Sequence, residues 1–241
     1  MAKGGKARAL RAPRRWLLRL AALVVLFAMA FAAWLWWDMR AWRPDPAMYP
    51  EQGALVPASG ADVRFATLKA VGAQFVYLPL AAGASGTDAP GGFADRFARA
   101  QEAGLQVGVL LHFDPCAGAD AQSGLFAQMV PRDPDLLPPA IGLDRLADTC
   151  APKVSDAAVE SELMTLINQI ETHAGRSVIL KLTPAFQERH STATTLARDL
   201  WLARDRARPD YAGRPWLLWS ANSALVTEAS EEPVEWVVVQ K

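Results

Sequence analysis

Two acidic residues that could carry acid–base chemistry stand at the ends of expected strands. Asp144 ends the apolar segment 139–144, and Asp114 follows the apolar segment 106–113. Because a strand points alternate side chains to the same face, positions 142 and 144 face the same way. A carboxylate at such a strand end can donate or accept a proton. Position 142, which could supply a second acid, is a glycine. Asp144 also has a structural interpretation, as a loop cap or as an ion-pair partner of Arg145 or Arg176.

The order of apolar and amphipathic segments predicts the elements that hold these residues. Strands are expected in short apolar runs, at residues 53–56, 74–80, 106–113, 139–143 and 177–182, with later apolar segments at 200–203, 216–221 and 235–240. Helices are expected in amphipathic segments, at residues 62–71, 93–103, 119–130 and 156–173. Strands that alternate with helices imply a parallel sheet. This many units predicts an α/β, TIM-like barrel of about eight strands with fewer than eight helices.

The N-terminal segment has the composition of a membrane anchor. Residues 1–19 contain seven basic residues and no acid, and residues 20–37 are uncharged. As a helix, these 18 residues extend about 27 Å, close to the thickness of a bilayer's hydrocarbon core. Three tryptophans near its end suit the lipid interface, and the excess of basic residues before it predicts a cytoplasmic N-terminus. A cleaved signal peptide is the alternative, because residues 28–30 have the small-residue pattern of a cleavage site.

These features divide the chain into four parts. We expect a basic cytoplasmic tail at 1–19, a transmembrane helix at 20–37, a linker at 38–48 and a barrel domain at 49–241. Beyond the tail, 18 basic residues face 25 acidic ones, a balance that excludes nucleic-acid binding by charge. No phosphate-binding glycine loop or nucleophile elbow is present in the sequence, and no cofactor is expected.

The two cysteines, Cys116 and Cys150, follow the third and fourth expected strands. Neighbouring parallel strands bring such loops together, and thiols of an exported domain oxidise. A disulfide at the rim of the barrel is therefore expected, with two unpaired buried thiols as the alternative. No histidine pair lies near them, so they do not predict a zinc site, and no other metal is expected.

An ordered series of segments resembles the lysozymes of glycoside hydrolase family 25. The series is YPEQG (49–53), FATLK (65–69), VGAQFVYL (71–78), AGLQVGV (103–109), VPRDP (130–134), LPP (137–139) and RPWLLW (214–219). In particular it is similar to the proteobacterial members with one cysteine after the third strand and one after the fourth. The resemblance covers residues 49–241 and implies a barrel of eight strands whose ancestral substrate is the peptidoglycan glycan strand.

The resemblance also implies which positions once carried the chemistry. Family members hydrolyse the bond after N-acetylmuramic acid with acids at the C-terminal ends of the strands. This reaction needs a proton donor and a second group that stabilises or attacks the oxocarbenium centre. The family's aspartate, apolar residue and glutamate of the fourth strand fall at Gly142, Leu143 and Asp144. The proton-donor position thus keeps an acid that is one methylene shorter, and its companion is lost.

Further polar positions of the family are substituted in this chain. The aspartate of the first strand is Leu55, and the glutamine after Trp219 is Ser220. The lysine and glutamate after the second strand fall at Pro79 and Ala82, and the tyrosine and histidine of the third strand fall at Leu110 and Leu111. His112 lies one place out of register, so it is expected on the other face of its strand. Glu235 takes the place of a late aspartate.

Three residues are candidate substrate contacts, and each has a structural alternative. Glu235 either contacts a sugar or closes a hydrogen-bond network at the end of the barrel. Trp219 either stacks on a sugar ring or belongs to the core, as alternate tryptophans on late strands often do. Tyr77, in the second strand, is the third candidate.

Two functions follow from these substitutions. The first is a lysozyme-like domain, anchored by residues 20–37 as a single-pass protein of the inner (cytoplasmic) membrane, whose barrel lies in the periplasm or outside the cell. It would have lost hydrolysis and would bind peptidoglycan, another envelope glycan or an envelope protein. The second is a weak or altered muramidase that uses Asp144 as the acid, with water or Asp114 in support.

Overall fold

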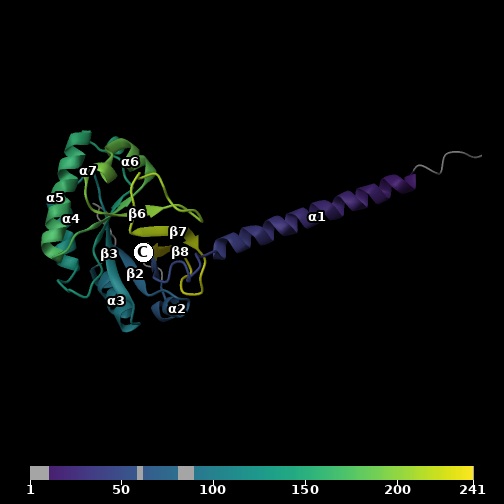
Figure 1. Cartoon of the computed structure of the whole chain (residues 1–241), viewed down its shortest axis with the longest axis horizontal. Helices are drawn as coiled ribbons and strands as arrows, with labels where there is room; N and C mark the ends of the chain where they lie inside the picture. The colour runs from purple at the N-terminus through teal and green to yellow at the C-terminus, as the bar shows by residue number, and fades with distance from the viewer. Residues whose placement is uncertain (1–10, 59–61, 81–89, 241) are drawn as a thin grey trace, which may run out of the picture. The chain divides into compact units, whose positions relative to one another are not determined.

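Eight strands close into one barrel, and their order around it follows the sequence (Figure 1). The computed structural model describes residues 11–58, 62–80 and 90–240. The strands are β1 (Gln52–Leu55), β2 (Phe75–Leu80), β3 (Gln106–His112), β4 (Ala140–Leu143), β5 (Ile179–Leu182), β6 (Asp199–Ala203), β7 (Leu218–Leu225) and β8 (Val234–Val239). Strands β1 to β7 pair in parallel, while β8 is antiparallel to both β7 and β1. The predicted eight-stranded α/β barrel is confirmed.

Seven α-helices are present in the described residues, so the expectation of fewer than eight is also confirmed. They are α1 (Arg11–Ala41), α2 (Phe65–Ala70), α3 (Pro90–Glu102), α4 (Ala119–Met129), α5 (Asp156–Ala174), α6 (Pro184–His190) and α7 (Thr192–Thr195), with a 3-10 turn, η1, at Ala147–Thr149. The side chain of Ser155 caps the start of α5, and Gly175 ends the helix with φ +68°, a value that glycine adopts without strain. Residues 184–195 were not predicted as helices, because α6 and α7 are too short for a periodic apolar pattern.

The side chains of the strands form two apolar layers, one inside the barrel and one between the barrel and its helices. The inner layer contains one or two residues from each strand: Leu55, Phe75, Tyr77, Leu110, Ala140, Ile179, Trp201, Leu218 and Val237. The outer layer is larger and includes the buried faces of α2 to α6. Alternate residues along each strand therefore belong to different layers, and this alternation decides which side chains reach the mouth at the strands' C-terminal ends.

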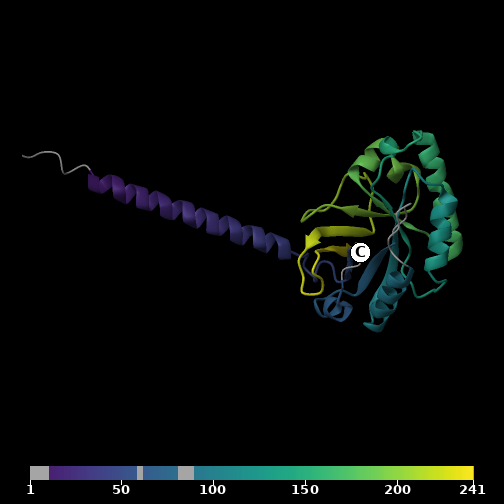
Figure 2. The same ribbon diagram turned by 180° about the vertical axis from the view of Figure 1, so that it is seen from behind.

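No helix follows β6 in the described chain, and residues 42–50 pack on this part of the barrel instead. The carbonyl of Trp42 accepts a hydrogen bond from Asn222 Nδ2 at 2.9 Å, and Arg43 lies over the ring of Trp236. Tyr49 is buried and contacts Trp219 edge to face. We call residues 42–50 the strap (seen beside β7 and β8 in Figure 2). Of the expected linker 38–48, residues 38–41 belong to α1 and residues 42–48 belong to the barrel unit.

The helix α1 forms a unit of its own, which ends at Ala41, and the barrel unit begins at Trp42. One stretch of α1, Trp16–Ala41, is long and apolar enough to cross a membrane. Its described side chains are exposed.

Candidate functional site

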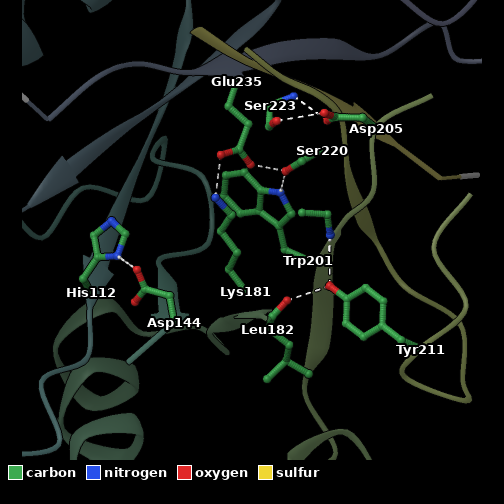
Figure 3. Close-up of polar contacts among 11 residues, drawn as sticks. His112, Asp144, Lys181, Leu182, Trp201, Asp205, Tyr211, Ser220, Ser223 and Glu235 are labelled. Carbon is green, nitrogen blue, oxygen red and sulfur yellow. Dashed lines mark hydrogen bonds and ion pairs between the residues drawn. The ribbon is translucent and has the colours of Figure 1, made fainter. Parts of the chain in front are cut away.

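The mouth of the barrel holds a histidine that sequence reasoning assigned to the wrong face. In β3, Leu110 belongs to the inner layer and Leu111 to the outer layer. His112 therefore shares the face of Leu110, and its ring reaches the mouth beside Asp144 (Figure 3). The expectation that His112 points away from the site is wrong. Leu110, two residues earlier, faces the inside of the barrel, so His112 faces the inside as well.

His112 and Asp144 form the first polar pair of the mouth. The Nδ1 atom of His112 lies 3.2 Å from Oδ2 of Asp144, and the two side chains are 28% and 41% exposed. Gly142 is the register partner of His112 across β3 and β4, and a Cβ at position 142 would lie 3.0 Å from Nδ1 of His112. The imidazole thus occupies the space next to Asp144 that a side chain at position 142 would need.

The surroundings of Asp144 keep it ionised. Partial burial is the largest single influence and raises its pKa, but it is outweighed by the hydrogen bond and charge of His112, a backbone hydrogen bond and the charge of Arg145. Together these hold the pKa of Asp144 below its ordinary value. A general acid that works near neutral pH needs the opposite, a carboxyl group whose pKa is raised so that it holds its proton. Asp144 is therefore a poor proton donor in this structure.

The second polar cluster lies inside the mouth and joins four strands. Lys181 Nζ of β5 donates to Glu235 Oε2 of β8 at 2.7 Å, and both side chains are about five-sixths buried, with 16% and 17% exposed. The hydroxyl of Ser220 in β7 donates to the other oxygen of Glu235 and accepts from Trp201 Nε1 at 2.6 Å. The Lys181 ammonium also lies 5.0 Å from the centre of the Trp201 ring (Figure 3). Glu235 therefore closes a hydrogen-bond network, which was one of its two predicted interpretations.

Lys181 and Trp201 were missed by the sequence reasoning. The signal for Lys181 was a cation within the apolar strand 179–182, two residues after the inward-facing Ile179. A charge at an inward position of a barrel strand needs a partner of opposite sign, since an isolated charge is costly to bury. Glu235 was the available acid at the same end of the barrel. The alternation of inward and outward side chains along β5 therefore predicts that Lys181 faces inward and pairs with Glu235.

Two further positions that the resemblance marks as substituted, Leu55 and Pro79, lie on the strands β1 and β2. Leu55 is buried in the inner layer and pairs in register with Glu235 of β8 and Tyr77 of β2. Pro79 is buried in β2, opposite Leu110. Ala82 lies outside the described residues. The side chain at position 55 contributes hydrocarbon, and no acid, to the wall of the mouth.

Tyr77 and Trp219 do not present groups to the mouth. Tyr77 is buried, its hydroxyl donates to the Pro138 carbonyl at 3.0 Å, and burial raises its pKa, partly opposed by Arg176. Trp219 belongs to the outer layer, where its Nε1 donates to the Arg204 carbonyl. Both side chains are part of the packing of the barrel. We do not retain them as candidate ligand contacts.

Asp114 lies on the rim, next to the confirmed disulfide between Cys116 and Cys150. Its Oδ1 accepts from the backbone N–H of Cys116 at 2.9 Å, and its backbone is held by both ends of the Gln122 amide. A cavity of about 470 Å³ opens beside it, lined by the loops after β3 and β4, including Asp114, Cys116, Arg145 and Asp148. The disulfide thus borders a rim cavity whose wall includes the charged residues Asp114, Arg145 and Asp148.

No cluster of three or more metal-ligating side chains occurs among residues 11–58, 62–80 and 90–240. The polar groups of the mouth are bound to one another instead.

The fold and the mouth define an α/β-barrel protein with its polar site at the C-terminal ends of the strands, where barrel enzymes carry their active sites. The sequence model of the glycosyl hydrolases family 25 matches residues 58–226, and the chain belongs to this family. A comparison with curated proteins finds no match.

Solved structures with the same fold include several from this family. A family 25 glycosyl hydrolase from Bacillus anthracis has a TM-score of 0.72 and 21% identity, over 84% of this chain and 93% of that one. A bacterial lysozyme from Streptomyces coelicolor has a TM-score of 0.66 and 16% identity, over 79% and 92%. A muramidase from Trichobolus zukalii has a TM-score of 0.62 and 18% identity, over 79% and 94%. At these identities the similarity establishes the fold.

Proposed function

We propose that this protein is a membrane-anchored, lysozyme-like domain of the cell envelope that binds a peptidoglycan-type glycan and has lost hydrolysis. The observation that carries the proposal is the pairing of Asp144 with His112 in the space beside Gly142. Glycoside hydrolysis needs a protonated donor and a second acid or nucleophile. Asp144 is held ionised, and Glu235 is bound to Lys181 and Ser220. Neither carboxyl group is prepared for its part of the reaction.

The rim cavity supports binding. It is open and is bordered by Cys116 of the disulfide. Its wall includes Arg145, which can pair with the carboxylate groups that peptidoglycan carries. The leucines of the mouth weaken binding of a hydroxyl-rich sugar at the centre, because buried hydroxyls lose water without gaining partners. We therefore place the glycan contact at the rim.

The location of the protein rests on α1 and the disulfide. The stretch Trp16–Ala41 is long enough to span a bilayer, and the basic residues that precede residue 20 favour a cytoplasmic N-terminus. A disulfide needs an oxidising compartment such as the periplasm. Both support an inner-membrane, single-pass protein whose barrel lies on the outer side. Protease treatment of spheroplasts should digest the barrel and leave the N-terminal tail protected.

A single experiment separates this proposal from a weak muramidase. Full-length protein in detergent is incubated with insoluble peptidoglycan, and both co-sedimentation and new reducing ends are measured. We expect binding without product, and Arg145→Ala should reduce the binding while Arg132→Ala, an exposed arginine outside the rim cavity, should not. Reducing ends that disappear in Asp144→Asn would show hydrolysis and refute the proposal. The muramidase alternative draws on the exposure of Asp144 at the mouth. If neither binding nor product is found, an envelope protein becomes the better candidate partner.

A further inference from the structure

We propose that the barrel lies docked on the lipid surface, with the strap and the first part of the loop after β6, residues 204–208, against anionic headgroups. This inference rests on the proposed membrane anchor. It concerns a surface that no enzymatic role explains, on the side of the barrel that lacks helices after β6. We call the strap together with residues 204–208 the docking face.

The first argument is the length of the chain between the anchor and the barrel. The uncharged segment ends at Trp37, and the barrel already holds the chain at Trp42 through the hydrogen bond from Asn222. Five residues span at most about 18 Å even when fully extended. Trp42, where the chain enters the docking face, therefore cannot lie farther than this from the end of the uncharged segment. If the expected linker, residues 38–48, were extended along its whole length, it would allow about twice that distance.

The second argument is the chemistry of the docking face. Arg43, Arg206 and Arg208 are exposed around the point where the chain enters the barrel. Two hydrogen bonds hold the loop after β6 in place. The Tyr49 hydroxyl of the strap accepts from Arg208 Nε at 2.7 Å, and the Ala221 carbonyl of β7 accepts from the backbone N–H of Arg206 at 2.8 Å. Guanidinium groups beside a bilayer attract anionic headgroups.

The acids of the same region are engaged with neighbouring groups. Asp205 accepts from the backbone and the hydroxyl of Ser223, and Asp210 is paired with Arg204. Asp45 accepts from the backbone N–H of Ala47 within the strap. Hydrogen bonds from neutral donors leave the charges of Asp45 and Asp205 in place. The docking face carries four basic residues, Arg43, Arg204, Arg206 and Arg208, against these two acids, so its net charge is +2, or +1 when Asp210 beside it is counted.

An exposed apolar side chain completes the docking face. Met48 in the strap is 65% exposed, more than any other large apolar side chain described in the barrel unit. A flexible thioether chain among basic groups can enter the headgroup layer, where apolar burial adds to the electrostatic attraction. Because a 200-residue barrel is about 45 Å across, docking keeps the mouth close to the bilayer.

The test measures the distance of the docking face from lipid in the full chain. Both native cysteines are in the disulfide, so Met48→Cys can be labelled selectively with a fluorescent donor. Met164→Cys on α5, also exposed, is the matched control. Each protein is reconstituted in phosphatidylcholine liposomes with or without 30% phosphatidylglycerol, which carry an acceptor on the lipid headgroups. A second series inserts twenty Gly/Ser residues between Ala41 and Trp42.

We expect at least threefold stronger energy transfer from position 48 than from position 164. With the inserted linker, the difference should persist in phosphatidylglycerol liposomes at low salt. The difference in energy transfer between positions 48 and 164 should fall at least twofold when the salt is raised to 0.5 M or when the liposomes are pure phosphatidylcholine. The same loss is expected for the double variant Arg206→Glu/Arg208→Glu. The control variant Arg132→Glu, which changes an exposed arginine outside the docking face, should leave this difference unchanged. Equal transfer from the two positions, or loss of the difference at low salt once the linker is inserted, would overturn the proposal. Failure of the anchor is distinguishable, because the protein would then not float with the liposomes after carbonate extraction.

Discussion

A Cβ atom added to Gly142 would lie 3.0 Å from Nδ1 of His112, so the two positions cannot both carry full side chains without a shift. The histidine ring is held at Asp144, on the neighbouring strand end. A side chain at position 142 and the imidazole of His112 therefore compete for the same space. A variant that restores an acid at position 142 must also displace the ring.

This relationship predicts a coupling between the two positions. Gly142→Asp alone should lower the free energy of unfolding by about 1–3 kcal/mol, the usual cost of overpacking. In the presence of His112→Ser, which removes the ring, the same change should cost less than half as much. Urea unfolding of the full chain in mild detergent, followed by tryptophan fluorescence, gives the four stabilities of the cycle. Additive effects would show that the contact does not limit position 142.

The pH dependence of stability provides a second prediction. The folded-state pKa of Asp144 is below its ordinary value, so its contribution to stability is present above about pH 4, the unfolded pKa. This contribution is lost as the pH falls through the folded pKa. His112→Ala removes the hydrogen bond and the charge that lower the pKa of Asp144 most. Burial, which raises this pKa, is then opposed less, so the pKa of Asp144 should rise.

The measurement is the difference in unfolding free energy between wild type and His112→Ala from pH 7 to pH 3. The difference should shrink at the acidic end, as Asp144 takes up a proton in both proteins. Asp144→Asn, compared with its own double variant Asp144→Asn/His112→Ala, is the control and should show a smaller difference at pH 7. A difference that is constant with pH would contradict the assigned role of the pair.

Much of the fold could be predicted because local patterns are strong in this barrel. Each parallel strand is a short apolar run, and α5 has both a serine cap and a terminal glycine. The strap could not be predicted. Its buried contacts are with Trp219, Asn222 and Trp236, more than 160 residues away, and no local pattern carries that information. A Pro-containing segment therefore resembled a free linker.

The candidate site was predicted only in part, because some of its features are local in the sequence and others depend on contacts between distant residues. The rim residues Asp144 and Asp114 and the cysteine pair were found from strand ends, which are local features. The placement of His112 depended on an alignment shifted by one residue, and such a shift reverses the face of a strand. Lys181 was missed because its importance comes from Glu235, across the barrel.

A third prediction concerns the ion pair inside the mouth. Replacing Glu235 with Gln leaves the Lys181 ammonium largely buried without its counter-charge, and should lower the free energy of unfolding by about 2–4 kcal/mol. Lys181→Met/Glu235→Leu removes both charges and should cost at least 1 kcal/mol less than Glu235→Gln. Arg189→Ala, which breaks the exposed pair with Asp156, is the matched control for a surface ion pair and should cost much less than Glu235→Gln. Equal losses for the single and double variants would show that the pair has no role beyond packing.

The last prediction tests the proposed loss of hydrolysis by introducing acids at the mouth. The variant Leu55→Asp/Gly142→Asp/Asp144→Glu with His112→Ser regains the acids that the family resemblance implies and the space that they need. It should release reducing ends from peptidoglycan, whereas the same three acid substitutions with His112 intact should release at least tenfold fewer. Activity should remain low, because Asp at position 55 would stand opposite Glu235, whose charge Lys181 only partly offsets. If the triple variant is as active as the quadruple one, the imidazole does not block the site. If a folded quadruple variant releases no product, Leu55, Gly142 and Asp144 are insufficient to explain the loss, and the substitutions at Pro79 and Ala82 become the next to reverse.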